Sequence, residues 1–429
     1  MYFLPLLYFS CLTYYFWHKH KSVDLAVYMS VLFVITSFCC VVMVLGNYLS
    51  SEGGVLLDGW EPEFGFIPTI LYCGLITLTI YPFSYVRPEM LKKVGNVHRY
   101  TIYAFTFFIV LQGLVVFYLV GDSVTDLLSG DFKYLKDAHY SGDISPADVK
   151  MLTMPLPVQM LYLTCFMTLL ALPLFFYYTC IEKRSIWLTS PLLAISLSPI
   201  LREILVADRT EIIHYGLMFL FCLVLFKGII TRKVRNFLMI TSVPVAIIGF
   251  IYFAAVSVSR FENSDEGAGG SVLEYAGQSY VNFCYFYDNH DRELYYLERE
   301  FPLVSFFGFK TQYVDTKEER SAKEGFFVGV FASHVGSWLL DTGIVGTIIL
   351  SSLFYIICCV VIRRYNRSEF DIAEILFIFT LGAVPTFGIF YYRYYSIGTA
   401  FVYLAAGILF AYSKIQFIWE KSDLEQIEK

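Results

Sequence analysis

The chain has 429 residues, of which 57% are hydrophobic, 19% aromatic and only 16% charged, with a formal net charge of -6. A water-soluble protein could not hide that much apolar surface in its core and still present a charged surface to water. The composition therefore excludes an ordinary soluble protein and predicts a polytopic membrane protein. No basic tract with interleaved aromatic residues indicates nucleic-acid binding.

Apolar segments of about 20 residues, the length that crosses the hydrocarbon layer, recur along the whole chain. They predict an all-α protein with eleven transmembrane helices, near residues 2–17, 25–46, 66–84, 100–120, 156–181, 186–206, 210–230, 237–257, 336–361, 370–390 and 397–417. The first segment is short, but it lacks the basic start and the cleavage site of a signal peptide, so we expect it to remain as a helix. Without repeats or long polar segments, residues 1–429 are expected to form a single membrane domain.

The basic residues of the short loops predict the orientation, because cytoplasmic loops retain Lys and Arg. Alternate loops carry them, at His18–Lys21, Arg87–Arg99, Lys183–Arg184, Arg232–Arg235 and Arg363–Arg367. Residues 47–65, in the opposite set of loops, contain four acidic residues and no Lys or Arg. This asymmetry places the N-terminus outside and the C-terminus inside.

Two predicted outer loops exceed the usual length of a connection. Residues 121–155 mix turn residues with short amphipathic stretches, and residues 258–335 form the largest loop. After a glycine-rich turn, apolar or aromatic residues follow at 272, 275, 276, 280, 283 and 287, close to helical spacing. We interpret this stretch as an amphipathic helix lying on the membrane surface.

Ionisable residues cluster where the 186–206 and 210–230 segments meet, from Arg202 to His214. Charges at the edge of a membrane segment are costly and suggest a function. Arg202 and Arg209 could bind a lipid-linked phosphate or diphosphate, since guanidinium groups contact phosphate oxygens bidentately. Alternatively, they pair with Glu203, Asp208 or Glu211 and reach the headgroups.

Arg260 and His334 bracket the large loop. Arg260 follows the end of a predicted helix, where an Arg can simply anchor the helix at the interface, but it faces the same side as Arg209. His334 lies where the chain re-enters the bilayer, in a glycine-spaced segment that includes Asp341. It could accept the proton of a sugar hydroxyl, because its pKa is ordinarily near neutral, or it could only hydrogen-bond at a helix start.

Aromatic residues crowd the large loop, Tyr280 among them, and also the turn around Arg393. They could stack on sugar rings, but an interfacial aromatic belt explains them equally well. The sequence has no P-loop, Rossmann glycine fingerprint, HExxH or GxSxG motif, and its ten cysteines form no CxxC pair. Nucleotide-driven reactions and metal-dependent hydrolysis are therefore not expected.

The chain resembles the bacterial oligosaccharide repeat-unit polymerases of the Wzy type, which are similar in architecture to the O-antigen ligases. The resemblance covers nearly the whole chain: many helices, one large outer loop, Arg209-Thr210 at a helix start and Ser259-Arg260-Phe261 at the loop exit. Its most specific part is Ser333-His334, followed by the glycine-spaced segment 339–346. Val335 departs from the ligases, which usually have a polar residue there.

The resemblance implies a GT-C-like fold in the bacterial inner membrane, with the large loop in the periplasm. It implies inverting glycosyl transfer without metal or other cofactor, from a glycan on undecaprenyl diphosphate to a lipid-linked repeat unit. Arg209 and Arg260, with Arg202, would hold the diphosphate, and His334 would accept the proton of the attacking hydroxyl. Asp341, Tyr280 and Arg393 would contact the acceptor or its sugars. A chain-length regulator and a flippase would be partners.

Three other functions fit the same sequence. An O-antigen ligase performs the same chemistry on lipid A core. A transporter, such as the flippase of the pathway, usually has internal repeats and charges near the bilayer midplane, whereas here the charges cluster at helix ends. The third alternative is a non-catalytic scaffold or an acyl-transfer enzyme. The gene neighbourhood would separate polymerase from ligase.

Overall fold

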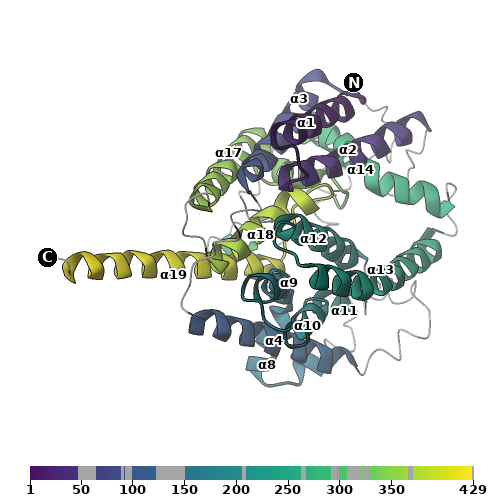
Figure 1. Cartoon of the computed structure of the whole chain (residues 1–429). Helices are drawn as coiled ribbons and strands as arrows, with labels where there is room; N and C mark the ends of the chain where they lie inside the picture. The colour runs from purple at the N-terminus through teal and green to yellow at the C-terminus, as the bar shows by residue number, and fades with distance from the viewer. Residues whose placement is uncertain are drawn as a thin grey trace. The chain divides into compact units, whose positions relative to one another are not determined.

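Figure 1 shows the computed structural model of the chain, which is helical wherever it is described, apart from turns and one isolated bridge between Ser333 and Tyr391. The described residues are 1–46, 64–87, 91, 99–121, 150–204, 209–261, 267–290, 297, 299–306, 321, 328–365 and 371–427. Most of the predicted acidic loop 47–65, residues 122–149 of the 121–155 loop and Asp208 lie outside these ranges, as do parts of the large loop.

Six helices in the described part are long and apolar enough to cross a membrane: Leu25–Leu45, Phe66–Tyr85, Arg99–Gly121, Arg232–Val258, Ser333–Ile362 and Ile397–Gln416. A seventh is the pair Leu156–Leu163 and Cys165–Ile181, bent by 57°, if it counts as one span. These helices support a multi-pass helical membrane protein. The count of eleven spans is not confirmed.

The remaining predicted segments are helical but short or interrupted. The helix α1 (Leu4–His20) has 17 residues. The 186–206 segment is split at Ser196 and Leu197 into α10 (Ile186–Ile195) and α11 (Ser198–Ile204). Shorter apolar helices cover Thr210–Phe226 (α12) and Ile372–Phe387 (α18).

The chain divides into two compact units, each built from three stretches of sequence. The first contains residues 1–86, 254–362 and 382–397, and the second contains 87–253, 363–381 and 398–429. The expectation of a single membrane domain over residues 1–429 stays a prediction. Each unit is described below by itself.

In the first unit, α1 and α2 (Leu25–Leu45) form an antiparallel pair against α3 (Phe66–Ile80) and the 3-10 helix η1 (Tyr81–Tyr85). Asp24 begins α2 by accepting a hydrogen bond from the Val27 amide at 2.9 Å, and it also pairs with His20 at the end of α1. The rings of Phe9, Phe33 and Tyr72 pack together between the three helices. The capping hydrogen bond of Asp24 and the aromatic contacts together hold the hairpin of α1 and α2 in place.

The predicted amphipathic helix is present as α14 (Gly267–Asn289), but it does not lie on the surface of the unit. Residues 277–284 are buried, and the helix packs on α2 and α3. At Gly277, a Cβ would come within 2.8 Å of the Cys39 carbonyl carbon, so only glycine permits this close approach of the two backbones. The small residues of the sequence thus allow a buried helix where the apolar spacing alone predicted an interfacial one.

The second unit contains α4 (Arg99–Gly121) packed against a broken helix composed of α8 (Leu156–Leu163), η3 (Cys165–Leu170), α9 (Ala171–Phe176) and η4 (Tyr177–Ile181). The break at Thr164 removes regular helical bonds from an apolar environment. Gln112 of α4 compensates, because its amide donates to the Thr164 hydroxyl at 2.6 Å and to its carbonyl at 3.2 Å.

The helix α18 begins with a reciprocal capping arrangement in the second unit. The Asp371 and Glu374 carboxylates each accept a hydrogen bond from the other's backbone amide at 3.0 Å. Lys414 of α19 (Ile397–Ile427) lies 2.6 Å from the Glu374 carboxylate, and Ser413 hydrogen-bonds Asp371. This network joins the start of α18 to α19, and it pairs the buried Glu374 carboxylate with the Lys414 ammonium.

Candidate active site

The helix α17 (Ser333–Tyr365) starts against the turn at residues 388–392 of the same unit. The amides of Ser333 and His334 donate to the carbonyls of Phe390 and Gly388, at 2.7 and 3.0 Å. The Ser337 hydroxyl accepts from the Tyr392 amide at 3.2 Å. The first amides of a helix lack partners within it, so the turn satisfies them here. Ser333 has a φ of 64°, which is unusual for a residue other than glycine.

The His334 side chain is fully buried, and both ring nitrogens have a partner. Its Nδ1 lies 3.2 Å from the Gly388 carbonyl oxygen. Its Nε2 lies 3.1 Å from the hydroxyl of Thr79, near the end of α3. A carbonyl can only accept a hydrogen bond, so this contact requires the proton on Nδ1. The lone pair of the neutral ring is therefore on Nε2, directed at Thr79.

The Thr79 hydroxyl has a second acceptor within reach. It lies 2.8 Å from the carbonyl oxygen of Ile76 in its own helix. Its single proton can point to only one of the two acceptors at a time. The hydrogen bond that covers the Nε2 lone pair of His334 can thus open by rotation of a hydroxyl, with no movement of the backbone.

Asp341 lies seven residues after His334, which places the two side chains on one face of α17 about 10 Å apart along its axis. It is fully buried, and its Oδ2 accepts a hydrogen bond from the Glu300 amide at 3.4 Å. Glu300 is itself buried and forms an ion pair with Arg299 at 3.5 Å. The helix is then interrupted at Gly343, with φ 67° and ψ -178°, so His334 and Asp341 occupy a short separate segment of α17.

Arg393 belongs to the same turn that covers the start of α17. It is 4% exposed, and its guanidinium carbon lies 5.6 Å from the centre of the Phe387 ring. The neighbouring Tyr392 ring contacts Trp338 of α17 at 5.5 Å and Phe301 at 5.0 Å, measured between ring centres. The turn that carries Arg393 therefore also holds His334, whereas Asp341 lies about two helical turns further along α17.

Tyr280 occupies a different part of the first unit. Its hydroxyl lies 2.6 Å from the Thr69 hydroxyl, and its ring stacks on Phe64 at 5.5 Å. Burial raises the pKa of the Tyr280 phenol above its ordinary value, so the group is held as a neutral hydrogen-bonding partner. Thr69 precedes Thr79 by ten residues of α3, or about 15 Å along the helix, so Tyr280 is not brought next to His334.

A polar face of α14 also reaches the candidate site, and the sequence interpretation missed it. The Ser279 hydroxyl donates to the Ile389 carbonyl at 2.5 Å, and the Asn282 amide donates to the Phe331 carbonyl at 2.8 Å. Asn282 also donates to Gln278, and all three side chains are buried. Their spacing of three and four residues is visible in the sequence, but the apolar residues of the same stretch give the stronger helical pattern. The sequence interpretation did not identify Thr79 and Glu300, because no motif in the neighbouring sequence distinguishes them.

The two arginines near residue 205 belong to the second unit. Arg202 lies over the rings of Tyr162 and Phe166, with its guanidinium carbon 4.9 and 5.3 Å from their centres. Arg209 is 8% exposed, precedes the first residue of α12, and lies 5.2 Å over the Phe253 ring. Each guanidinium is thus held against an aromatic face, and that of Arg202 also donates to the Cys165 sulfur at 3.7 Å.

A buried acid and imidazole lie within the two turns that follow Arg209. The Nδ1 of His214 is 3.3 Å from a Glu211 carboxylate oxygen, and both residues are less than 5% exposed. The sequence marks this cluster, although not the pairing within it. Arg260 lies in the last turn of α13 (Arg232–Phe261), and its side chain is outside the described part. The assignment of Arg260 to a diphosphate therefore stays a prediction.

Among the residues that the structure describes, His, Cys, Asp and Glu side chains form no group of three or more that could hold a metal ion. Comparison with known proteins adds no assignment: no protein-family model matches the chain, and neither a curated protein nor a solved structure matches it. The chemistry of the candidate site is therefore argued from its own residues.

Proposed function

We propose that this protein is a membrane glycosyltransferase that polymerises lipid-linked oligosaccharide repeat units. The observation that carries the proposal is the His334 imidazole, whose Nδ1 is bound to the Gly388 carbonyl and whose Nε2 lone pair is directed at the Thr79 hydroxyl. The Thr79 hydroxyl can donate to the Ile76 carbonyl instead, which frees the Nε2 lone pair. The approach of a sugar hydroxyl to this buried nitrogen would also require the Thr79 side chain to move aside. A base with a fixed tautomer is what such a transfer needs.

The proposed reaction is an inverting displacement. The acceptor hydroxyl oxygen attacks the anomeric carbon of the donor glycan, and Nε2 of His334 takes the hydroxyl proton. The bond from the anomeric carbon to the diphosphate oxygen breaks, and undecaprenyl diphosphate leaves with the bonding electrons. Arg209, with Arg202 and Arg260, would bind this leaving group and offset the negative charge that develops on it.

Asp341 and Arg393 would contact the acceptor. They share the segment and the turn that hold His334, and a carboxylate and a guanidinium both hydrogen-bond to sugar hydroxyls. Tyr280 is the weakest of the predicted sugar contacts, since its hydroxyl is already bonded to Thr69.

We further propose that the protein lies in the bacterial inner membrane with its N-terminus outside and its C-terminus inside. The distribution of Lys and Arg among the loops supports this orientation. Alkaline phosphatase fused after Gly121 should be active, and the same fusion after Lys183 inactive. The reverse pattern would invert the topology and move the His334 end of α17 to the cytoplasm.

The proposed function is tested by deleting the gene in its host and separating the surface glycan by gel electrophoresis. A polymerase deletion should leave product capped with a single repeat unit, because ligation continues without polymerisation. Absence of any capped product would instead identify a ligase, and normal chain-length ladders would exclude both.

Complementation with variants tests the roles of individual residues. His334→Gln keeps hydrogen-bonding atoms but removes the base, and we expect it to lower the rate of chain extension by about 10²- to 10⁴-fold. Arg209→Ala and Arg260→Ala should also be defective. Full activity in all three variants would reject the site and leave the fold unaffected.

A further inference from the structure

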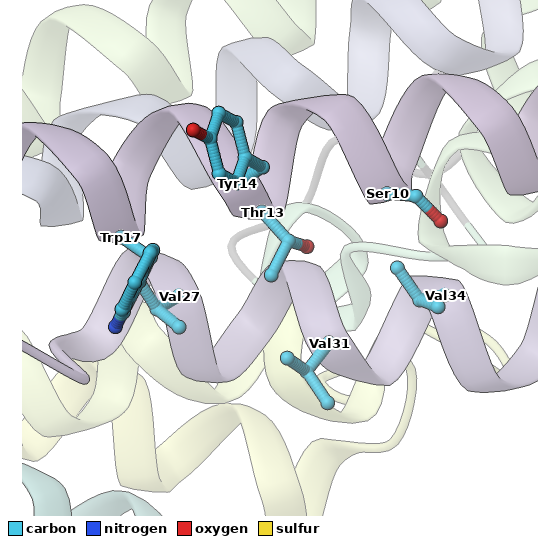
Figure 2. Close-up of a pocket in the computed structure, with 7 residues that line it drawn as sticks. All are labelled: Ser10, Thr13, Tyr14, Trp17, Val27, Val31 and Val34. Carbon is cyan, nitrogen blue, oxygen red and sulfur yellow. The ribbon is translucent and has the colours of Figure 1, made fainter.

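A groove runs between α1 and α2 on the surface of the first unit (Figure 2). It has a volume of about 390 Å³ and is lined by Ser10, Thr13, Tyr14, Trp17, Val27, Val31 and Val34. Because the two helices are antiparallel, the groove extends from Trp17 and Val27 near the connecting turn to Ser10 and Val34. Its volume is within the range of about 300–1,000 Å³ typical of small-molecule sites.

The lining of the groove is mainly apolar, although three of its residues, Ser10, Thr13 and Tyr14, carry a hydroxyl. The Thr13 hydroxyl donates to Ser30 of α2 at 2.9 Å, so its proton is already used. The remaining surface consists mostly of valine methyl groups and the rings of Tyr14 and Trp17. Such an apolar groove suits a hydrocarbon chain better than a sugar or a nucleotide.

The end of the groove at Trp17 is positively charged. The last turn of α1 contains His18, Lys19 and His20, and Lys21 follows in a left-handed conformation with φ 52°. The Lys21 ammonium lies 5.9 Å from the centre of the Trp17 ring, directly beside the groove. Asp24, the acidic residue of this turn, caps α2 and pairs with His20. A net positive charge therefore remains where the apolar groove ends.

We propose that this groove binds one acyl chain of an anionic phospholipid, with the lipid phosphate against Lys21. Three observations combine in this assignment: an apolar lining, an aromatic residue of the type found at membrane interfaces, and a basic group at the same end. Lysine near a bilayer surface attracts anionic headgroups, and the apolar stem of its side chain lies along the hydrocarbon. The site is separate from His334 and does not depend on the proposed enzymatic reaction.

Fluorescence quenching of Trp17 tests the proposal. The full-length protein is placed in phosphatidylcholine bilayers that contain brominated phosphatidylglycerol or, at equal mole fraction, brominated phosphatidylcholine. The contribution of Trp17 is the difference between the wild type and Trp17→Phe. We expect brominated phosphatidylglycerol to quench Trp17 with about fivefold higher relative affinity, the effect of one lysine near the surface.

Three variants separate the parts of the site. Lys21→Gln should abolish the preference for the anionic lipid, and Val31→Phe should reduce quenching by both lipids because it fills the groove. Ile35→Phe is the matched control, since Ile35 lies one turn further along α2, is half exposed, and does not line the groove. It should leave quenching unchanged.

Equal quenching of Trp17 by the two lipids would overturn the proposal and show only ordinary surrounding lipid. So would a preference that survives Lys21→Gln. If Val31→Phe instead changed the oligomeric state in gel filtration, the groove would be an interface between copies of this chain, and the lipid assignment would be wrong.

Discussion

Thr79 and His334, which are 255 residues apart in the sequence, meet through a contact of 3.1 Å between a hydroxyl oxygen and Nε2. The contact joins the end of α3 to the start of α17 and lies on the nitrogen that carries the lone pair. Because the same hydroxyl can turn to Ile76, the proposed proton transfer to His334 does not require the Thr79 proton. We therefore expect the Thr79 contact to contribute to the stability of the site and not to its proposed chemistry.

Thr79→Val should therefore destabilise the protein and leave chain extension largely intact. The substitution keeps the shape but leaves a buried ring nitrogen without its partner, at a cost of about 1–3 kcal/mol. Unfolding in mild detergent would measure the loss. The control is Thr36→Val, because the buried Thr36 hydroxyl donates only to the Phe33 carbonyl of its own helix. A variant of unchanged stability that made no polymer would assign the proton transfer to Thr79 instead.

Gly388→Ala should damage the same site from the other side. A Cβ at this position would lie 2.3 Å from His334 Nδ1 and 2.2 Å from the Val384 carbonyl oxygen, which is closer than atoms can approach. The turn or the imidazole must then move, with an expected loss of about 1–3 kcal/mol typical of overpacked cores. Circular dichroism during thermal unfolding would show a lower midpoint.

Gly74→Ala provides the matched comparison for that variant. Gly74 lies within α3 of the same unit, and a Cβ there would meet no atom within 4 Å. Alanine favours a helix over glycine by about 1 kcal/mol, so this variant should be as stable as the wild type or more stable. Equal effects of the two substitutions would contradict the assigned role of Gly388.

Gln112→Leu should destabilise the bent helix of the second unit. The substitution removes the donor that satisfies Thr164 at the break, and a hydrogen bond between membrane helices contributes about 0.6–1.7 kcal/mol. A double-mutant cycle with Thr164→Ala would measure this coupling directly. Purely additive losses would show that the bend is held by packing alone.

The sequence predicted the helices well because apolar length is a local property. Every segment expected to cross the membrane is at least partly helical in the described residues. The break at Thr164 was not predicted, since no proline or glycine marks it and the compensating donor, Gln112, lies 52 residues earlier. Interruptions of this kind depend on a distant side chain, and composition within one segment cannot reveal them.

The candidate site was predicted less completely for the same reason. The position of His334 at a helix start followed from its glycine-spaced neighbours, but its partners Thr79 and Gly388 come from other elements. Likewise, the apolar spacing of α14 predicted a helix without indicating which face would be buried. Gly277 decides that, because it lets α14 approach the α2 backbone near Cys39.

Cys284 should resist alkylation in the folded protein, although it belongs to the predicted large outer loop, in the stretch expected to form an amphipathic helix on the membrane surface. Its side chain is fully buried in α14, and burial raises the pKa of its thiol above the ordinary value, so the reactive thiolate is scarce. Raising the pH from 7 to 9 should speed the labelling of an exposed thiol about tenfold per pH unit until the pH reaches the pKa of that thiol, but it should barely affect Cys284.

Peptide mass spectrometry after maleimide treatment would measure the labelled fraction of Cys284. The control is Asn289→Cys, at the exposed end of the same helix. Denaturation should make both positions react. If native Cys284 were labelled as fast as the residue introduced at position 289, α14 would not be buried against α2 in the membrane.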